Sequence, residues 1–442
     1  MNRKEEANAP GPAIPLPTAR QLEWADAEIG VIIHYDIQVF EPGYEWRAQW
    51  GYTPSTQLFQ PEDLDTDQWI EAAKSAGATY AVLVAKHCSG FSLWPTEAHD
   101  YSVRSTPWRD GQGDIVGDFV QSCRKYGLRP GLYYSVSANA HYRVDNPGLV
   151  KNGSEAEQQA YNEAVIRQVT ELWTRYGPLF EIWFDGGTLP VEAGGPDVAG
   201  ALRRLQPDAV CFQGPLGFPS LVRWSGNEDG SAPDPCWSRA DYERRVTENG
   251  LAPSSGGGNP EGEVWAPAEA DLPNRREQWF WYEGEDHLLI PVDELVERYY
   301  TSVGRNANLM IGMVIDRRGR VPDADAAQFA AFGEAVRRKF AHALGETEGR
   351  GYELTLELEQ APATLVNQVT VMEQLAEGER IRAYRIEGLA AGGVWMPLCE
   401  GRSIGHKRIE RFEAVSLSAI RLIVDEAVDT PVIRKLIAYH AE

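Results

Sequence analysis

Short apolar runs alternate with amphipathic stretches along most of the chain. The apolar runs are rich in β-branched and aromatic residues, as buried parallel strands are, and lie at 30–34, 79–84, 129–135, 180–185, 209–212, 222–224 and 309–313. The stretches between them carry apolar residues at helical spacing and lie at 69–76, 114–126, 154–176, 198–205, 292–303 and 324–340. Repeated strand–helix units predict an α/β fold, a (β/α)8-like barrel over residues 19–345. A dinucleotide-binding sheet would need a glycine-rich phosphate loop after the first strand, and this sequence has none there.

The periodicity changes near residue 350. Apolar and polar residues then alternate, as in half-buried strands, at 352–358, 368–372, 382–386, 419–424 and 432–439. We therefore expect a small C-terminal antiparallel β-sandwich over residues 350–442. Residues 1–18 are polar and rich in proline and alanine, and we expect a flexible leader there.

One predicted strand ends in a carboxylate. The run 180–184 (FEIWF) leads directly to Asp185, and Gly186 and Gly187 follow at once. Side chains at the carboxyl ends of barrel strands face the pocket in which chemistry occurs. Asp185 is therefore a candidate catalytic acid. The alternative is that it only caps the loop or helix that follows, as aspartate often does.

Other polar residues stand at or just past the ends of predicted strands. They are His34, His87 and Tyr134, and they are flanked by Trp46, Trp94 and Trp183. A single histidine at a strand end is more often structural than catalytic. Several such residues on the same rim as Asp185 indicate an active site.

Glycoside hydrolysis is one chemistry that fits this rim, and it uses two carboxyl groups, one ionised and one protonated. Asp185 is the candidate for the ionised group. Glu228, within 223–230 (RWSGNEDG), and Glu269, within 265–271, are candidates for the protonated one. Spacing alone does not choose between them.

Metal-assisted hydrolysis is a rival interpretation of the same residues. His34, Asp36, His87 and Asp185 have side chains that bind zinc or manganese. No two of them show the close spacing, such as i and i+4, that makes a metal-site prediction strong. The pattern therefore favours chemistry without a metal or other cofactor.

Composition narrows the choice of partner. The net charge of −23 opposes binding to nucleic acid or to an anionic membrane. The 14 tryptophans and 18 tyrosines suit sugars, whose rings have apolar faces and polar rims, although most aromatic residues belong to a core.

The five cysteines are scattered, so neither a disulfide framework nor a zinc cluster is indicated. No run is long enough to span a membrane and no apolar signal segment is present, so we expect a cytoplasmic protein. The oligomeric state stays open.

Several motifs, in the same order along the chain, resemble the α-L-fucosidases of glycoside hydrolase family 29. The resemblance extends over nearly the whole chain and rests on 30–34, 45–46, 58–61, 85–95 (AKHCSGFSLWP), 100–103, 183–186 (WFDG), 223–228, 302–309 (SVGRNANL) and 405–409. It implies a (β/α)8-like barrel, a C-terminal β-sandwich and a retaining mechanism.

The resemblance also implies roles for particular residues. Asp185 would be the nucleophile that forms a covalent glycosyl-enzyme, and Glu228 would be the general acid and then the general base. The asparagine–glutamate–x–glycine setting of Glu228, and its spacing from Asp185, look like those of the subgroup selective for α-1,3/1,4-linked fucose. The positions that match the fucose pocket are His34, Glu45, Trp46, His87, Tyr134 and Trp183, with Arg223 and Trp279 as weaker matches.

The chain departs from the family pattern at two places. Cys88 and Ser89 stand where the family usually has a second histidine and an aspartate, and Tyr35-Asp36 replaces an aromatic–glycine step. Loss of one hydrogen-bonding group from a buried sugar site costs about 1–3 kcal/mol. Three hypotheses therefore stay open: another group replaces the histidine, the preferred sugar differs, for instance an α-L-galactoside, or the chain is a carbohydrate-binding pseudoenzyme.

Overall fold

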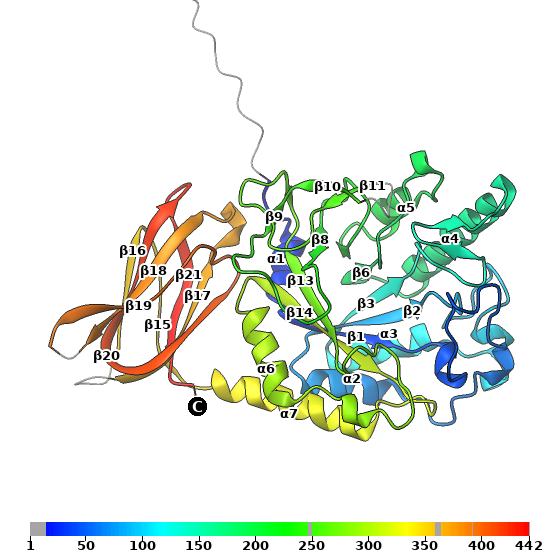
Figure 1. The fold of residues 1–442 in the computed structure, drawn as a ribbon, viewed down its shortest axis with the longest axis horizontal. Coiled ribbons are helices and arrows are strands. Elements are labelled where there is room, and N and C mark those ends of the chain that lie inside the picture. The colour runs from blue at the N-terminus through cyan, green and yellow to red at the C-terminus, as the bar shows by residue number, and fades with distance from the viewer. Residues whose placement is uncertain (1–14, 246–249, 359–363, 391, 442) are drawn as a thin grey trace, which may run out of the picture.

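The structure is a computed structural model that describes residues 15–245, 250–358, 364–390 and 392–441. Most of the predicted leader, residues 1–14, lies outside the described residues. Eight parallel strands close into a barrel in the order β1-β14-β13-β8-β7-β6-β3-β2, which confirms the predicted fold class (Figure 1). The strands are β1 (Ile29–His34), β2 (Tyr80–Lys86), β3 (Arg129–Tyr134), β6 (Glu181–Trp183), β7 (Val210–Phe212), β8 (Leu221–Trp224), β13 (Ala268–Pro273) and β14 (Ala307–Val314).

Helices surround the barrel, and the first five α-helices along the chain begin at a residue whose side chain caps the first turn. They are α1 (Ala19–Ala25), α2 (Thr66–Ser75), α3 (Ile115–Tyr126), α4 (Glu155–Arg175), α5 (Val198–Leu205), α6 (Val292–Thr301) and α7 (Asp323–Lys339). Asp65 and Asp114 accept hydrogen bonds from the backbone of the first turns of α2 and α3, and Ser154 forms a capping box with Glu157 at the start of α4. Among the described residues, no helix combines the length and the apolarity that a membrane span requires.

Helix α1 is an element that the hydrophobic pattern did not predict. Thr18 and Gln21 form a capping box at its start, and the Gln21 amide donates to the carbonyl oxygens of Leu221 (2.8 Å) and Trp265 (2.9 Å). The helix therefore packs its buried Trp24 against the barrel interior. Its seven residues are too few to show a clear helical period.

A seven-stranded antiparallel sheet follows the barrel and has its own hydrophobic core. Its strands are β15 (Ala343–Arg350), β16 (Glu353–Glu357), β17 (Thr364–Glu373), β18 (Ile381–Ala390), β19 (Val394–Gly401), β20 (Arg408–Ala427) and β21 (Val432–Tyr439). The long strand β20 pairs with β17 near its start and with β18 and β16 further along. The sheet begins at Ala343, earlier than the predicted boundary at 350, because the edge strand β15 is polar and largely exposed and gives no alternating signal.

Short elements fill the loops. Three two-stranded sheets pair β4 (Val144–Asp145) with β5 (Leu149–Val150), β9 (Arg239–Ala240) with β12 (Val264–Trp265), and β10 (Tyr242–Arg245) with β11 (Gly250–Pro253). Single 3-10 turns lie at Ile37–Phe40, Thr56–Leu58, Val103–Ser105, Trp108–Gly111, Val191–Ala193, Asp286–Leu288 and Leu375–Glu377.

Candidate active site

A cavity of about 360 Å³ lies at the carboxyl ends of the barrel strands. Residues at or after the ends of β1, β2, β3, β6, β8 and β13 line it, together with two loops at 38–47 and 277–282. Eight of the predicted site residues line this one cavity: Asp185, Glu228, His34, Glu45, Trp46, His87, Trp183 and Trp279. The barrel therefore gathers side chains that are up to 245 positions apart in the sequence.

The turn after β6 presents Asp185 to the cavity. Gly186 and Gly187 both have left-handed backbone angles (φ of 73° and 79°), which allow the chain to turn directly after the carboxylate. The Tyr133 hydroxyl donates a hydrogen bond to Asp185 Oδ2 at 3.2 Å. Below it, the Trp183 ring stacks on Phe212 with the ring centroids 3.9 Å apart. Asp185 is therefore exposed to the cavity but held on a rigid base.

Glu228 lies at the mouth of the cavity, on the loop after β8. The Trp279 indole N–H donates to Glu228 Oε2 at 3.2 Å. The Asn227 amide donates to the carbonyl oxygen of Ser231 (3.1 Å), and the Gly230 N–H donates to the carbonyl oxygen of Asp271 (3.0 Å). These bonds fix the backbone on both sides of Glu228, whose side chain is exposed.

Two histidines form part of the wall. The rings of His34 and His87 lie 6.0 Å apart in an edge-to-face arrangement, and Phe280 contacts both, at 5.2 and 5.1 Å. Burial lowers the pKa of His34 well below its usual value, with the nearby His87 as a second cause. Burial also lowers the pKa of His87, against the attraction of Asp36 and Asp185. Each ring is therefore neutral near pH 7 and offers one donor and one acceptor to a ligand.

The two departures from the family pattern contact each other. The Ser89 hydroxyl donates to Asp36, at 2.8 Å from Oδ1 and 2.7 Å from Oδ2, and Asp36 also caps the turn that starts at Ile37. Burial raises the pKa of Asp36 to about 6. Relative to the family pattern, this chain therefore has an additional carboxyl at position 36 and lacks the usual one at position 89.

Cys88 lines the cavity, whereas Ser89 does not. The Cys88 sulfur lies 4.0 Å from the Ser135 hydroxyl oxygen. Burial raises the pKa of the Cys88 thiol to about 12, with the Asp185 charge as a further cause. The side chain is therefore a neutral thiol and a weak hydrogen-bond donor.

Tyr134 lies outside the cavity, which corrects its prediction as a pocket residue. Side chains alternate across β3, so Tyr134 points to the helical layer while Tyr133 points into the barrel. The Tyr134 hydroxyl donates to Gln168 Oε1 at 2.7 Å, and the ring is buried. Tyr133, the preceding residue, lines the cavity instead.

Arg223 also lies outside the cavity, which corrects the second prediction. Its side chain is 1% exposed and donates to the carbonyl oxygen of Trp237 (2.6 Å) and to that of Gly256. It supports two loops behind the site and does not line the cavity. Sequence reasoning missed Tyr133, Asp271 and Phe280, which do line it.

Glu269 lies below the cavity floor. It accepts hydrogen bonds from the Trp183 indole (2.8 Å) and the Tyr80 hydroxyl (2.9 Å), and burial raises its pKa to about 7. The buried Glu181 is a close neighbour, and its pKa is raised well above the usual value by burial and by Glu269. Glu269 therefore supports Trp183 from beneath and does not face a ligand.

Asp271 is the carboxyl of β13 that reaches the cavity. It accepts a hydrogen bond from the Trp224 indole at 2.7 Å, and burial raises its pKa well above the usual value. Within the described ranges, no group of three or more His, Cys, Asp or Glu side chains is arranged to hold a metal ion. His34, Asp36, His87 and Asp185 thus do not form such a group.

Comparison with known proteins adds independent information. The sequence model of the family described as "Alpha-L-fucosidase" matches residues 15–339. Alpha-L-fucosidase 1 of Arabidopsis thaliana is 30% identical over 97% of this chain and 88% of its own length. A crystal structure of a putative α-L-fucosidase from Bacteroides thetaiotaomicron is 36% identical, with a TM-score of 0.90 over 97% of this chain and 100% of that one. A glycoside hydrolase 29 family member from a rumen bacterium is 28% identical, with a TM-score of 0.81 over 98% of this chain and 78% of that one.

Proposed function

The chain belongs to the α-L-fucosidase family of glycoside hydrolases, and from this premise we propose that it removes terminal α-L-fucosyl groups with retention of configuration. Asp185 is the nucleophile and Glu228 the general acid and base. The observation that carries the proposal is that these two carboxyls, from the ends of β6 and β8, line one cavity beside two neutral histidines.

The two carboxyls have different tasks in this mechanism. Asp185 attacks the anomeric carbon while Glu228 protonates the leaving oxygen, and a covalent glycosyl-enzyme forms. Glu228 then removes a proton from water, which attacks the anomeric carbon and releases Asp185. The Tyr133 hydroxyl orients the nucleophile, and the Trp279 indole orients the acid.

The cavity wall suits a deoxy sugar. Neutral His34 and His87 present donors and acceptors for sugar hydroxyls, and the Phe280 ring lies against both of them. An apolar ring beside two polar ones matches L-fucose, in which a methyl group adjoins a hydroxyl-bearing face.

Substitution of the two carboxyls tests the mechanism. Asp185→Ala is expected to lower kcat at least about 10⁴-fold, and azide should partly restore the rate as a substitute nucleophile. Glu228→Ala should slow fucosides with poor leaving groups about 10²- to 10⁴-fold while sparing an activated dinitrophenyl fucoside in its first step. NMR of the first product should detect α-L-fucose. Initial release of the β-anomer would overturn the retaining mechanism.

We also propose selectivity for α-1,3/1,4-linked fucose, which rests on the Asn227–Glu228 setting. Hydrolysis of a Lewis-type trisaccharide with little cleavage of p-nitrophenyl α-L-fucoside is the expected result. Equal rates on both would contradict this selectivity.

A preference for another sugar is the second candidate, and the observation that favours it is Cys88 in the cavity wall. Its thiol is a weaker hydrogen-bonding group than the imidazole usual in the family. Faster hydrolysis of an α-L-galactoside than of the matching α-L-fucoside would support this candidate. Binding of fucose without turnover of any fucoside would instead identify a pseudoenzyme.

A further inference from the structure

The segment 231–239, which follows the Glu228 loop, leaves the cavity and runs along the C-terminal sheet. Alternate residues of this segment are held by that sheet or by the loops between its strands. Asp234, Cys236 and Ser238 each bind a residue beyond position 378, more than 140 positions away in the sequence. The loop that carries the proposed acid is therefore anchored partly outside the barrel.

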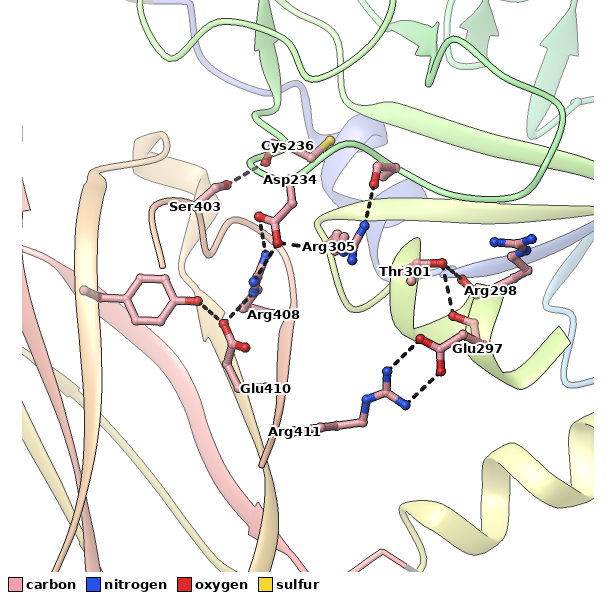
Figure 2. A network of polar contacts seen from close by, with 12 residues as sticks. Asp234, Cys236, Glu297, Arg298, Thr301, Arg305, Ser403, Arg408, Glu410 and Arg411 are labelled. Atoms are coloured by element: carbon pink, nitrogen blue, oxygen red, sulfur yellow. Dashed lines mark hydrogen bonds and ion pairs between the residues drawn. The ribbon is translucent and has the colours of Figure 1, made fainter. Parts of the chain in front are cut away.

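The first anchor is a bidentate ion pair. The Arg408 guanidinium donates to Asp234 Oδ1 at 2.8 Å and to Oδ2 at 3.0 Å, as Figure 2 shows. Its third nitrogen, Nε, donates to Glu410 at 2.7 Å, and Glu410 also accepts from the Tyr384 hydroxyl. Arg408 is therefore fixed by its own sheet before it meets Asp234, which reduces the entropy lost in forming the pair.

The second and third anchors hold the backbone. The Ser403 hydroxyl donates to the carbonyl oxygen of Cys236 at 2.6 Å. The buried Glu379 carboxylate accepts from the Ser238 N–H (2.9 Å) and hydroxyl (2.7 Å), and from the Asn306 amide (2.7 Å). Three hydrogen bonds to one buried carboxylate make this contact costly to break.

The barrel also holds this segment, at several points along it. Asn227 bonds Ser231, and the Ala232 N–H donates to the carbonyl oxygen of Thr301 at 2.8 Å. From Asp234 onward the barrel and the C-terminal sheet share the support, because Arg223 of β8 donates to the carbonyl oxygen of Trp237 at 2.6 Å and the Asn306 amide donates to that of Cys236 at 3.1 Å. Among the described residues, Trp279 donates the one hydrogen bond to the exposed Glu228 side chain, so the position of this side chain depends on the backbone that carries it.

We propose that the C-terminal sheet helps to set the position of Glu228, together with the barrel contacts of the same loop, and that Arg408 and Glu379 are its positioning residues. The inference rests on the proposed role of Glu228 as general acid and base. Displacement of a catalytic group by about 1 Å can lower a rate about 10²-fold, so the loss of one anchor of this segment can slow the step that needs the acid.

The same strand supplies a matched control. Arg411 of β20 also makes a bidentate pair with the barrel, at 2.9 and 2.7 Å from the two oxygens of Glu297 on α6 (Figure 2). This pair joins the same two parts of the molecule but does not touch the Glu228 loop. Both substitutions remove a bidentate arginine–carboxylate pair, but only Arg408→Ala releases the segment that follows the Glu228 loop; Arg408→Ala also removes the bond to Glu410 within the sheet.

The test compares kcat/KM for two substrates in the full-length variants. A fucosyl oligosaccharide needs protonation of its leaving group, whereas a dinitrophenyl fucoside does not. Arg408→Ala should lower the rate on the oligosaccharide about 10- to 100-fold and change the dinitrophenyl fucoside less than about threefold. Arg411→Ala should leave the ratio of the two rates as in the wild type. Equal losses on both substrates in Arg408→Ala, or the same change of ratio in Arg411→Ala, would overturn the inference.

Two further variants keep the outcomes distinct. Arg408→Lys preserves the charge but cannot form two parallel hydrogen bonds, so it should show the same selective loss in smaller degree even if Arg408→Ala does not fold. Glu228→Ala tests the premise with the same substrates. If Glu228→Ala lacks a leaving-group effect, the proposed function fails. If Glu228→Ala shows the effect and both Arg408 variants do not, only the positioning role fails.

Discussion

Three carboxyls of the cavity accept hydrogen bonds from aromatic side chains. Tyr133 donates to Asp185, Trp279 to Glu228 and Trp224 to Asp271. A neutral donor orients a carboxyl but stabilises its charge less than a guanidinium would. This arrangement suits a site in which one carboxyl must attack and another must exchange a proton.

The pair Tyr133 and Tyr134 offers a test of this role. Tyr133→Phe removes the bond to Asp185 and should lower kcat about 10- to 100-fold, since a hydrogen bond to a charged group contributes about 1.5–3 kcal/mol. Tyr134→Phe should leave kcat unchanged and lower the free energy of unfolding by about 1–3 kcal/mol, because Gln168 loses its buried donor. Steady-state kinetics and urea unfolding measure the two effects. Loss of activity in Tyr134→Phe alone would reverse the assignment.

This pair also shows how far a sequence can assign single residues. The sequence correctly predicted that strand β3 contributes a tyrosine to the rim of the barrel. A shift of one position along a strand, however, moves a side chain from one face to the other. Both tyrosines are large, aromatic and buried, so composition carries no signal that separates them. Only the closed barrel determines which of the two side chains points into the interior and which points to the helices.

At the scale of elements, β13 is the barrel strand that periodicity did not reveal. Its sequence, AEADLP, places Glu269 and Asp271 at alternate positions and ends in proline. Buried carboxyls are rare, so this pattern is typical of an exposed segment. Tyr80, Trp183 and Trp224 supply the donors that make burial possible here, and they come from other strands. Strands such as β1, β2 and β14 were predictable because their buried residues form continuous apolar runs.

Gly30 of β1 leaves space for one of these donors. A Cβ atom at this position would lie 2.4 Å from a ring carbon of Tyr80, whose hydroxyl bonds Glu269. Replacement of a strand glycine by alanine ordinarily stabilises a protein by about 0.5–1 kcal/mol. Gly30→Ala should instead destabilise by about 1–3 kcal/mol in urea unfolding, because Tyr80 must move. In a Tyr80→Leu background, Gly30→Ala should change the free energy of unfolding little. A loss as large as in the wild-type background would show that contact with Tyr80 is not the cause.

At the scale of the whole molecule, a further ionic contact joins the barrel to the C-terminal sheet. Glu28, just before β1, forms an ion pair with Lys407, lies 3.6 Å from His406 Nε2, and accepts from the Tyr299 hydroxyl at 3.2 Å. Burial acts to raise the pKa of Glu28, but Lys407 and His406 outweigh it and lower the pKa to about 2. These partners are nearly 380 positions away, so no local pattern predicts them.

The lowered pKa gives this contact a defined pH dependence. A carboxyl whose pKa is depressed in the folded state stabilises the protein above its unfolded pKa of 4.5, and the contribution disappears as the pH falls to about 2. Glu28→Gln should therefore be less stable than the wild type by about 1–3 kcal/mol at pH 7, with the difference vanishing near pH 2. Glu23→Gln, in an exposed ion pair with Arg20, should cost less than about 1 kcal/mol. A cost for Glu28→Gln that is the same at pH 3 and pH 7 would contradict the ion-pair origin.

The alternating contacts of Asp234, Cys236 and Ser238 with the C-terminal sheet also bear on how such chains can recombine. A crossover between α7 and β15 would join one parent's 231–239 segment to another parent's sheet, and the partners of Asp234 and Ser238 would then come from different lineages. Such a chimaera would keep the hydrophobic cores of the barrel and of the sheet intact, but it would lose the specific polar contacts between the two parts. Segment 231–239 and the sheet therefore form one unit of inheritance, although the barrel strands β13 and β14 separate them in the gene.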